Sequence, residues 1–222
     1  MRPPMSSIRQ FILKILCHPA IVEVASYLIW RRPTRIDQAR WDREYATVRL
    51  DHLGDITETP RFSLIAGYSR NIAAATSMLD IGCGDGRLSS LLCPDTIHCY
   101  VGIDIANIAI RKARERGVRH ARFEVADAAT FDPGARFDII VFSEVLYYMA
   151  NPELVLDRYE DFLTPAGVFI ISMWRSTGSL RTWRRCAARL KVLDEVRLRA
   201  ANKLEWDVRL CQPIRTLTES KE

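Results

Sequence analysis

The sequence of 222 residues predicts an α/β fold: a doubly wound, mostly parallel sheet of seven strands with helices on both faces. Three observations predict it. From residue 77 onward, short apolar runs alternate with segments of helical periodicity, which is typical of parallel strands joined by right-handed crossovers. Towards the C-terminus, residues 192–198 and 204–210 read as two further strands that lie too close together for a crossover helix, so they should pair as an antiparallel hairpin. The composition, 48% hydrophobic and 27% charged, is that of an ordinary globular domain.

The first part of the chain is predicted to be helical. Apolar side chains recur at helical spacing through residues 6–31 and are interrupted at Pro19, which predicts two short helices. We expect residues 1–58 to form a helical extension. Residues 59–222 are expected to form the main domain.

The main domain is predicted to alternate strands and helices in a regular order. Its fourth and fifth strands are almost wholly apolar, which is typical of central strands that are covered on both faces. A basic helix over residues 180–190 precedes the hairpin. The predicted strands span residues 77–81, 98–103, 121–126, 137–142, 168–174, 192–198 and 204–210, and the other predicted helices span residues 37–48, 60–74, 86–92, 107–116 and 152–163.

The charges are unevenly distributed along the chain. The formal net charge is +5, but residues 1–44 carry +4, residues 45–174 carry −5 and residues 175–222 carry +6. Basic ends suit an anionic partner such as nucleic acid or a lipid surface, and they equally suit arginines on solvated helices. The composition excludes a disordered, a collagen-like and a disulfide-stapled chain.

Cysteine usage and hydropathy predict the compartment. The six cysteines form no Cys-x-x-Cys pair and have no zinc spacing, so we expect reduced thiols, no metal and a cytoplasmic location. The longest uncharged run near the N-terminus, residues 15–22, is far shorter than the roughly 20 residues that span a membrane. The basic, amphipathic residues 6–32 would nevertheless suit peripheral contact with a membrane surface.

The strongest signal for chemistry is the run Leu-Asp-Ile-Gly-Cys-Gly-Asp-Gly-Arg-Leu at residues 79–88, where a predicted strand ends. Glycines lack Cβ, so the backbone can turn tightly and approach a ligand. A helix beginning near residue 86 would present its N-terminal N–H groups to that ligand. The alternative is a tight strand-to-helix turn that binds nothing. The candidates for cofactor binding are Asp80, Gly82, Cys83, Gly84 and Gly86.

The spacing of the glycines narrows the choice of ligand. The dinucleotide fingerprint is G-x-G-x-x-G, and its third glycine would fall at Arg87. Arg87 would block close packing of helix on strand, and Asp80 would repel a pyrophosphate. Asp80 suits a cationic ligand. S-adenosyl-L-methionine carries a sulfonium and an ammonium group and no phosphate, so we predict it as the cofactor.

Two more acids follow predicted strands at the same edge of the sheet. Asp104 ends the second strand, where an acid can accept both ribose hydroxyls of a nucleoside, with Ile105 beside it. Asp127 follows the third strand and could accept the adenine amino group while Ala128 offers its backbone N–H. For both acids the alternative is that they cap a following helix.

These residues resemble the motifs of the class I S-adenosylmethionine-dependent methyltransferases. The first motif resembles residues 79–86, the second-strand acid matches Asp104 and the third-strand motif matches Asp127. The resemblance covers roughly residues 41–213. It implies a Rossmann-like methyltransferase fold whose seven-stranded sheet ends in a hairpin, with the helices before the first strand forming a lid.

The resemblance also implies that the lid contacts the cofactor. Tyr45, in the pattern Trp41-Asp42-x-x-Tyr45, would lie near the methionine end of the cofactor. The alternative is that Trp41 and Tyr45 simply pack in the core. His52, in the polar segment that follows, could face the acceptor and act in catalysis.

The resemblance implies that the end of the fourth strand lies beside the transferring methyl group. Ser143 and Glu144 would line the boundary between cofactor and acceptor, and Tyr147 and Tyr148 would shape the acceptor cleft. Glu144 is the better candidate for a general base, because the ordinary pKa of tyrosine is about 10. Tyr148 could hydrogen-bond the acceptor. The alternative for Glu144 is that it caps the next helix.

We therefore predict a methyltransferase that acts on an oxygen or nitrogen of a small molecule or glycoconjugate, such as a sugar or a lipid-linked saccharide. Little chain is left for a nucleic-acid module, so a nucleic acid is not expected as the acceptor. The alternatives are an RNA or other nucleic-acid methyltransferase, favoured by the basic ends, and a non-catalytic S-adenosylmethionine-binding protein. A nicotinamide dehydrogenase is disfavoured by Asp80 and Arg87.

The charge pattern gives one further hypothesis. The acidic centre coincides with the predicted cofactor site, and the basic excess lies in the lid and after the fifth strand. If those basic segments flank the acceptor cleft, the acceptor is neutral or anionic. Arg181, Arg184 and Arg185 would then contribute to its binding.

Overall fold

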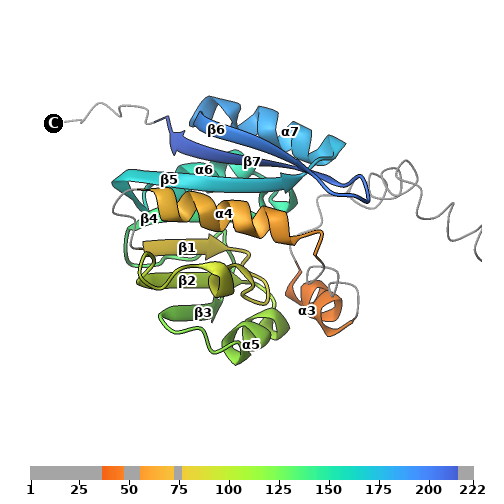
Figure 1. The fold of residues 1–222 in the computed structure, drawn as a ribbon, viewed down its shortest axis with the longest axis vertical. Coiled ribbons are helices and arrows are strands. Elements are labelled where there is room, and N and C mark those ends of the chain that lie inside the picture. The colour runs from red at the N-terminus through yellow and green to blue at the C-terminus, as the bar shows by residue number, and fades with distance from the viewer. Residues whose placement is uncertain (1–36, 48–55, 73–76, 215–222) are drawn as a thin grey trace, which may run out of the picture.

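A computed structural model of the chain describes residues 37–47, 56–72 and 77–214, and a seven-stranded sheet forms its centre (Figure 1). The strand order is β3-β2-β1-β4-β5-β7-β6. The pairs among β1 to β5 are parallel, and β7 pairs antiparallel with both β5 and β6. The predicted α/β fold and its C-terminal hairpin are confirmed. The strands are β1 (Ser77–Ile81), β2 (Cys99–Asp104), β3 (Ala121–Val125), β4 (Phe137–Ser143), β5 (Leu163–Trp174), β6 (Leu190–Arg199) and β7 (Glu205–Pro213).

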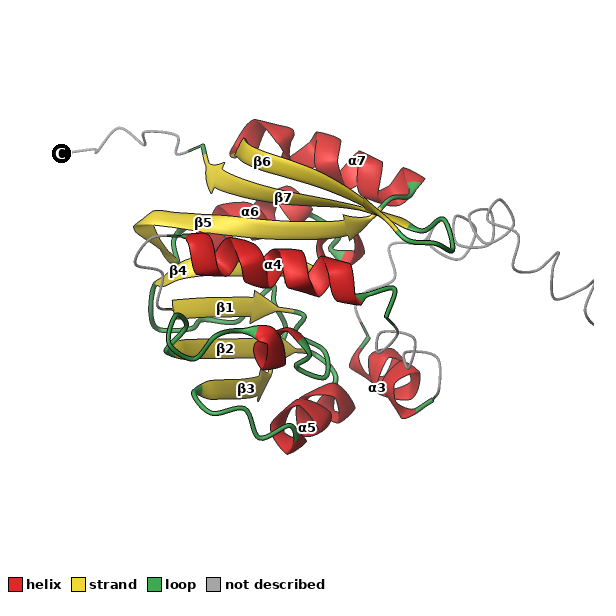
Figure 2. Cartoon of the chain, in the orientation of Figure 1, coloured by secondary structure: helices red, strands yellow, loops and turns green. Residues whose placement is uncertain are grey.

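The helices lie outside the sheet, and most of them connect one strand to the next along the chain (Figure 2). None of those that the structure describes is long and apolar enough to cross a membrane. The two helices predicted within residues 6–31 lie outside the described residues. The α-helices are α3 (Gln38–Ala46), α4 (Thr59–Asn71), α5 (Asn107–Glu115), α6 (Pro152–Glu160) and α7 (Thr177–Cys186), and the short 3₁₀ helices are η2 (Leu88–Leu91), η3 (Leu146–Tyr148) and η4 (Ala187–Arg189).

The sheet is covered on both faces because its central strands alternate their side chains between two hydrophobic clusters. On one face, Leu79 of β1 packs in the same cluster as Tyr159 of α6 and Trp183 of α7. On the other face, Met78 packs with Ile65 of α4. Figure 1 shows α4 in front of the sheet with α6 and α7 behind it. Burying each large apolar side chain stabilises the fold by about 1.5–3 kcal/mol.

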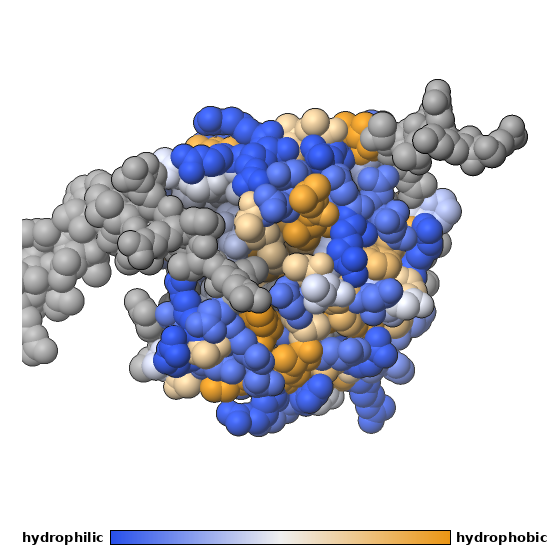
Figure 3. Space-filling model, turned by 180° about the vertical axis from the view of Figure 1, so that it is seen from behind, coloured by the Kyte–Doolittle hydropathy of each residue, from blue (hydrophilic) through white to orange (hydrophobic). Residues whose placement is uncertain are grey.

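The point where the chain reverses its direction across the sheet lies between β1 and β4. From β1 the chain builds outward through β2 to β3, and it then returns to place β4 on the other side of β1. The carboxyl ends of β1 and β4 therefore diverge into different connections and leave a crevice between them. Figure 3 shows the rear of the molecule, where hydrophobic residues lie in small groups among hydrophilic ones.

The segment after β1 differs from the prediction. The expected helix over residues 86–92 is reduced to the single 3₁₀ turn of η2, which begins at Leu88. Gly86 has a φ of +77° and its N–H donates to the carbonyl of Cys83, so residues 82–86 form a turn. A four-residue 3₁₀ helix has only a weak dipole. The polar groups that this segment offers to the crevice are therefore those of the loop backbone and not those of a helix N-terminus.

Candidate functional site

A cavity of about 390 Å³ opens at the carboxyl ends of β1, β2 and β4 and extends to the ends of β5 and β7. Its volume lies within the range of about 300–1,000 Å³ that is usual for small-molecule sites. Gly86 does not line this cavity, and His52 lies outside the described residues. The predicted site residues that line it are Tyr45, Asp80, Gly82, Cys83, Gly84, Asp104, Ile105, Asp127, Ala128, Ser143, Glu144 and Tyr148.

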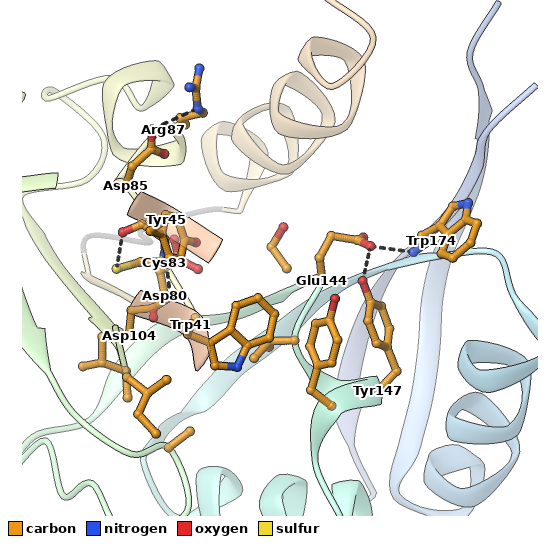
Figure 4. A pocket seen from close by; sticks show the side chains of 18 of the residues that line it. Trp41, Tyr45, Asp80, Cys83, Asp85, Arg87, Asp104, Glu144, Tyr147 and Trp174 are labelled. Atoms are coloured by element: carbon orange, nitrogen blue, oxygen red, sulfur yellow. Dashed lines mark hydrogen bonds and ion pairs between the residues drawn. The ribbon is translucent and has the colours of Figure 1, made fainter. Parts of the chain in front are cut away.

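The glycine loop, residues 82–86, ties β1 to β2. The N–H groups of Gly82 and Cys83 donate to the carbonyl oxygen of Ile103 at 2.8 and 2.9 Å. Gly84 has a φ of +57°, and a Cβ on it would lie 2.6 Å from the hydroxyl of Tyr45. This position therefore requires glycine both for its backbone conformation and for the close approach of Tyr45. Figure 4 shows Tyr45 beside Cys83 and Asp80.

Asp104 stands where β2 ends. Its two carboxylate oxygens accept from the N–H of Gly84 at 3.0 Å and from the N–H of Ala106 at 2.8 Å. Each oxygen keeps a second lone pair for a ligand hydroxyl. Burial raises the pKa of Asp104 to about 6, against the lowering effect of its backbone hydrogen bonds. Its alternative role as a helix cap is wrong, since α5 has no side-chain cap.

Asp80 is almost completely buried in the cavity wall, with 2% of its surface exposed. One carboxylate oxygen accepts from the hydroxyl of Tyr100 at 2.5 Å, whereas Oδ1 has no hydrogen-bond partner. Burial raises the pKa of Asp80 to about 7. A buried acceptor without a donor is costly, so this oxygen fits a ligand that brings a donor, such as an ammonium group.

Asp127 and Ala128 line the cavity at the end of β3. Asp127 accepts from the N–H of Ala129 at 2.9 Å, which forms a local turn within residues 127–129. No helix begins there among the described residues, so its predicted alternative as a helix cap is wrong. The carbonyl of Ala128 accepts from the hydroxyl of Tyr159 at 2.9 Å, which fixes the peptide against α6.

Glu144 lies directly after β4, at the opposite end of the cavity from the glycine loop (Figure 4). Its φ is +58°, a strained value for a residue with a side chain. Its carboxylate accepts from the hydroxyls of Ser172 and Tyr147, both at 2.9 Å, and from the N–H of Trp174 at 2.8 Å. Burial raises its pKa, with Arg61 acting in the opposite direction. The alternative that Glu144 caps the next helix is wrong, because η3 has no side-chain cap.

Aromatic rings connect the two ends of the cavity. Trp41 of α3 meets Tyr148 edge-on with ring centroids 5.0 Å apart, and Tyr147 lies 4.5 Å from Tyr148. Trp41 and Tyr45 both line the cavity, and both also belong to a small hydrophobic cluster with Ala106 and Ala109. Burial raises the pKa of Tyr148 to about 12, so its hydroxyl stays protonated at neutral pH and is not available as a base.

The sequence interpretation missed Arg61 of α4, which is almost completely buried in the cavity wall, with 2% of its surface exposed. Its Nε and Nη2 donate to Glu58 at 3.1 and 2.8 Å, and its Nη1 donates to the hydroxyl of Ser143. No motif surrounds Arg61 in the sequence. The sequence interpretation also missed Trp174 and Trp206, which line the cavity. Trp174 ends a predicted strand at the ligand edge of the sheet, and this position could have indicated its role.

The arginines after β5 are placed differently from the prediction. Arg181, Arg184 and Arg185 are absent from the described lining of the cavity. Arg185 instead binds Glu153 of α6 at 2.7 Å and the carbonyl of Ala150 at 3.0 Å. The prediction that this helix flanks the acceptor cleft is wrong, because α7 uses its last turn to pack on α6.

Comparison with known proteins gives a consistent result. A family model described as "Methyltransferase domain" matches residues 72–205. The chain is 33% identical over 130 residues to trans-aconitate 2-methyltransferase of Paracidovorax citrulli (strain AAC00-1), covering 56% of this chain and 50% of that protein. It is 36% identical over 104 residues to the ubiquinone biosynthesis O-methyltransferase of Azorhizobium caulinodans, covering 45% of this chain and 41% of that protein. The chain thus spans half or less of the length of these curated relatives.

Among solved structures, the N-methyltransferase NodS from Bradyrhizobium japonicum WM9, in complex with S-adenosyl-L-homocysteine, has the same fold. The TM-score is 0.69 and the sequence identity 21%, and the match covers 80% of this chain and 98% of that chain.

Proposed function

The chain belongs to the class I S-adenosylmethionine-dependent methyltransferases, and from this premise we propose that it methylates an oxygen or nitrogen of a small molecule or glycoconjugate. The observation that carries the proposal is the division of one cavity into two halves. Glycine-loop backbone and buried acids line one half, whereas Glu144 and aromatic rings line the other (Figure 4). This arrangement supports a cofactor and a separate acceptor in one cavity.

The acids at the ends of β2 and β3 would hold the nucleoside. Asp104 offers its remaining lone pairs to the two ribose hydroxyls, and Ile105 contributes apolar surface beside it. Asp127 would accept from the adenine amino group, and the N–H of Ala128 would donate to the ring. The carboxyl-end location of both acids supports this assignment.

The remaining cofactor residues would hold the methionine part. The unpartnered Oδ1 of Asp80 suits the ammonium group. Arg61, which already contacts Ser143, supplies the cation for the carboxylate. Tyr45 closes the site over Gly84 from α3. When bound, the cofactor supplies a methyl group on a positively charged sulfur, which is a good leaving group.

On the acceptor side, Glu144 would receive the proton that an acceptor hydroxyl loses. The hydroxyl of Tyr147 already donates to Glu144, so the acceptor proton can pass to Tyr147 as the tyrosine proton passes to the carboxylate. Tyr148 would orient the acceptor through its hydroxyl and does not act as a base. An amine acceptor that binds in its neutral form needs no base, and positioning alone can then supply much of the rate.

Calorimetry with S-adenosyl-L-homocysteine tests the cofactor half of this proposal. We expect binding, and its absence would contradict the proposal. The acceptor half is tested by incubating the protein with a methyl-labelled cofactor and with either small-molecule or RNA fractions of a cell extract. Label in the small-molecule fraction is the expected result, and label confined to RNA would favour a nucleic-acid methyltransferase.

A further inference from the structure

We propose that the acceptor of this enzyme is an uncharged, flat aromatic ring that carries the hydroxyl or amino group to be methylated. This inference rests on the proposed function and narrows its substrate class. It is carried by three properties of the acceptor half of the cavity: its aromatic wall, the internal pairing of its polar groups, and the lack of a free cation in its described lining.

The aromatic wall is built by three segments that are far apart in the sequence. Trp174 of β5 and Trp206 of β7 lie directly opposite each other in the antiparallel register, so their side chains are on the same face of the sheet. Both line the cavity, together with Tyr147 and Tyr148 from η3 and Leu204 from the hairpin turn. A flat ring can contact such rings face to face or edge to face, and each aromatic contact adds affinity beyond the buried area.

The polar groups of this half are already engaged with one another. The carboxylate of Glu144 accepts three hydrogen bonds, one of them from the hydroxyl of Tyr147. Arg61, which borders this half, directs its guanidinium to Glu58 and Ser143, and the proposed function assigns its charge to the carboxylate of the cofactor. A sugar ring would bring several hydroxyls that need partners, and each one buried without a partner would weaken binding. An aromatic ring with one or two polar groups makes no such demand.

Charge argues against an anionic acceptor. In the described lining of the cavity, the cations are Arg61 and Arg87. Arg61 forms an ion pair with Glu58 at 2.8 Å, and Arg87 forms one with Asp85 at 3.2 Å near the glycine loop. A polycarboxylate would therefore enter beside buried acids without a cation of its own, which is unfavourable.

The test compares three probes on the full chain saturated with S-adenosyl-L-homocysteine. Catechol is a flat diol, and trans-1,2-cyclohexanediol is its matched control, because it has the same ring size and hydroxyl number without an aromatic face. Citrate represents a polycarboxylate. Titration by NMR should show that catechol binds about tenfold more tightly than either other probe.

Variants of Trp206 and Trp174 test whether the preference for catechol depends on the aromatic wall. Trp206→Leu should weaken catechol binding about fivefold and leave cyclohexanediol binding unchanged, whereas Trp206→Phe should keep most of the catechol affinity. Trp174→Leu gives the same measurement at a more exposed position, in case Trp206→Leu does not fold. Each variant should still bind S-adenosyl-L-homocysteine as the wild type does, which confirms that it is folded.

Two failures can be distinguished. If the wild type does not bind S-adenosyl-L-homocysteine, the proposed function and this inference both fail. If it binds S-adenosyl-L-homocysteine but binds cyclohexanediol or citrate as tightly as catechol, only the aromatic acceptor is refuted. Unchanged catechol affinity in both leucine variants would also refute it.

Discussion

The affinity for S-adenosyl-L-homocysteine should rise about tenfold when the pH is raised from about 6 to about 8. The reason is the carboxyl group of Asp80, whose pKa burial raises to about 7. With that pKa, about one in eleven carboxyls is ionised at pH 6 and about ten in eleven at pH 8. Only the ionised form attracts an ammonium group strongly. The ammonium of the ligand stays protonated over this range, so Asp80 sets the slope.

The groups that face Asp80 fix the sign of the effect. Tyr100 donates to it and Arg61 is a nearby cation, and both favour the ionised form, whereas burial and Asp104 favour the neutral form and outweigh them. Asp104 itself has a pKa of about 6, so it is half ionised at the lower pH and adds at most about twofold.

The assay is calorimetry in steps of half a pH unit at constant ionic strength, with Asp80→Asn as the control. The variant cannot ionise at this position, so it should bind more weakly and retain only the shallow slope from Asp104. An equal slope in wild type and variant, or an affinity that falls as the pH rises, would refute the reasoning. Without ligand the opposite trend is expected: the folded pKa lies above the ordinary value of 3.8, so the free energy of unfolding falls as the pH rises from about 4 to about 7.

Three substitutions test other parts of the structure. Asp104→Ala should weaken the binding of S-adenosyl-L-homocysteine at least about tenfold in calorimetry, since it removes both predicted ribose contacts; an unchanged affinity would remove that assignment. Gly84→Ala should also abolish tight binding, because its φ is +57° and its Cβ would lie 2.6 Å from the Tyr45 hydroxyl; Tyr45→Phe in the same chain should restore part of it. Asp207→Asn should lower the free energy of unfolding by about 1–3 kcal/mol in urea denaturation, since this buried carboxylate binds Arg175 and a second arginine; no change would mean that the ion pairs are not needed.

Local sequence was sufficient where a function depends on neighbours along the chain. The glycine loop follows a strand directly and is contiguous in the sequence, so the loop and Asp80 could be recognised together. Asp104 and Asp127 could be predicted because parallel strands bring their carboxyl ends to one edge of the sheet. The close packing of Gly86 against Ala113 of α5 and Phe123 of β3 could not be predicted, because these residues are distant from the loop in the sequence.

The role of Glu144 shows the limit of such reasoning. The sequence places it correctly at the end of β4, and it leaves a base and a helix cap as equal alternatives. The structure excludes the cap, because η3 has no side-chain cap and two donors that reach the carboxylate, Ser172 and Trp174, belong to β5. A register between two strands, and not the order of residues, determines that contact.

The sequence by itself determined the fold class, the family and the edge of the sheet where the cavity opens, because these depend on periodicity and on a short contiguous motif. Only the tertiary structure placed Arg61 beside Ser143 and brought Trp174 and Trp206 together at the acceptor end. The physical reason is that the acceptor half is assembled from α4, β4, β5 and β7, whose side chains meet only after the sheet has formed. The same packing turns Arg185 towards α6, so this arginine binds Glu153 and is absent from the described lining of the cavity.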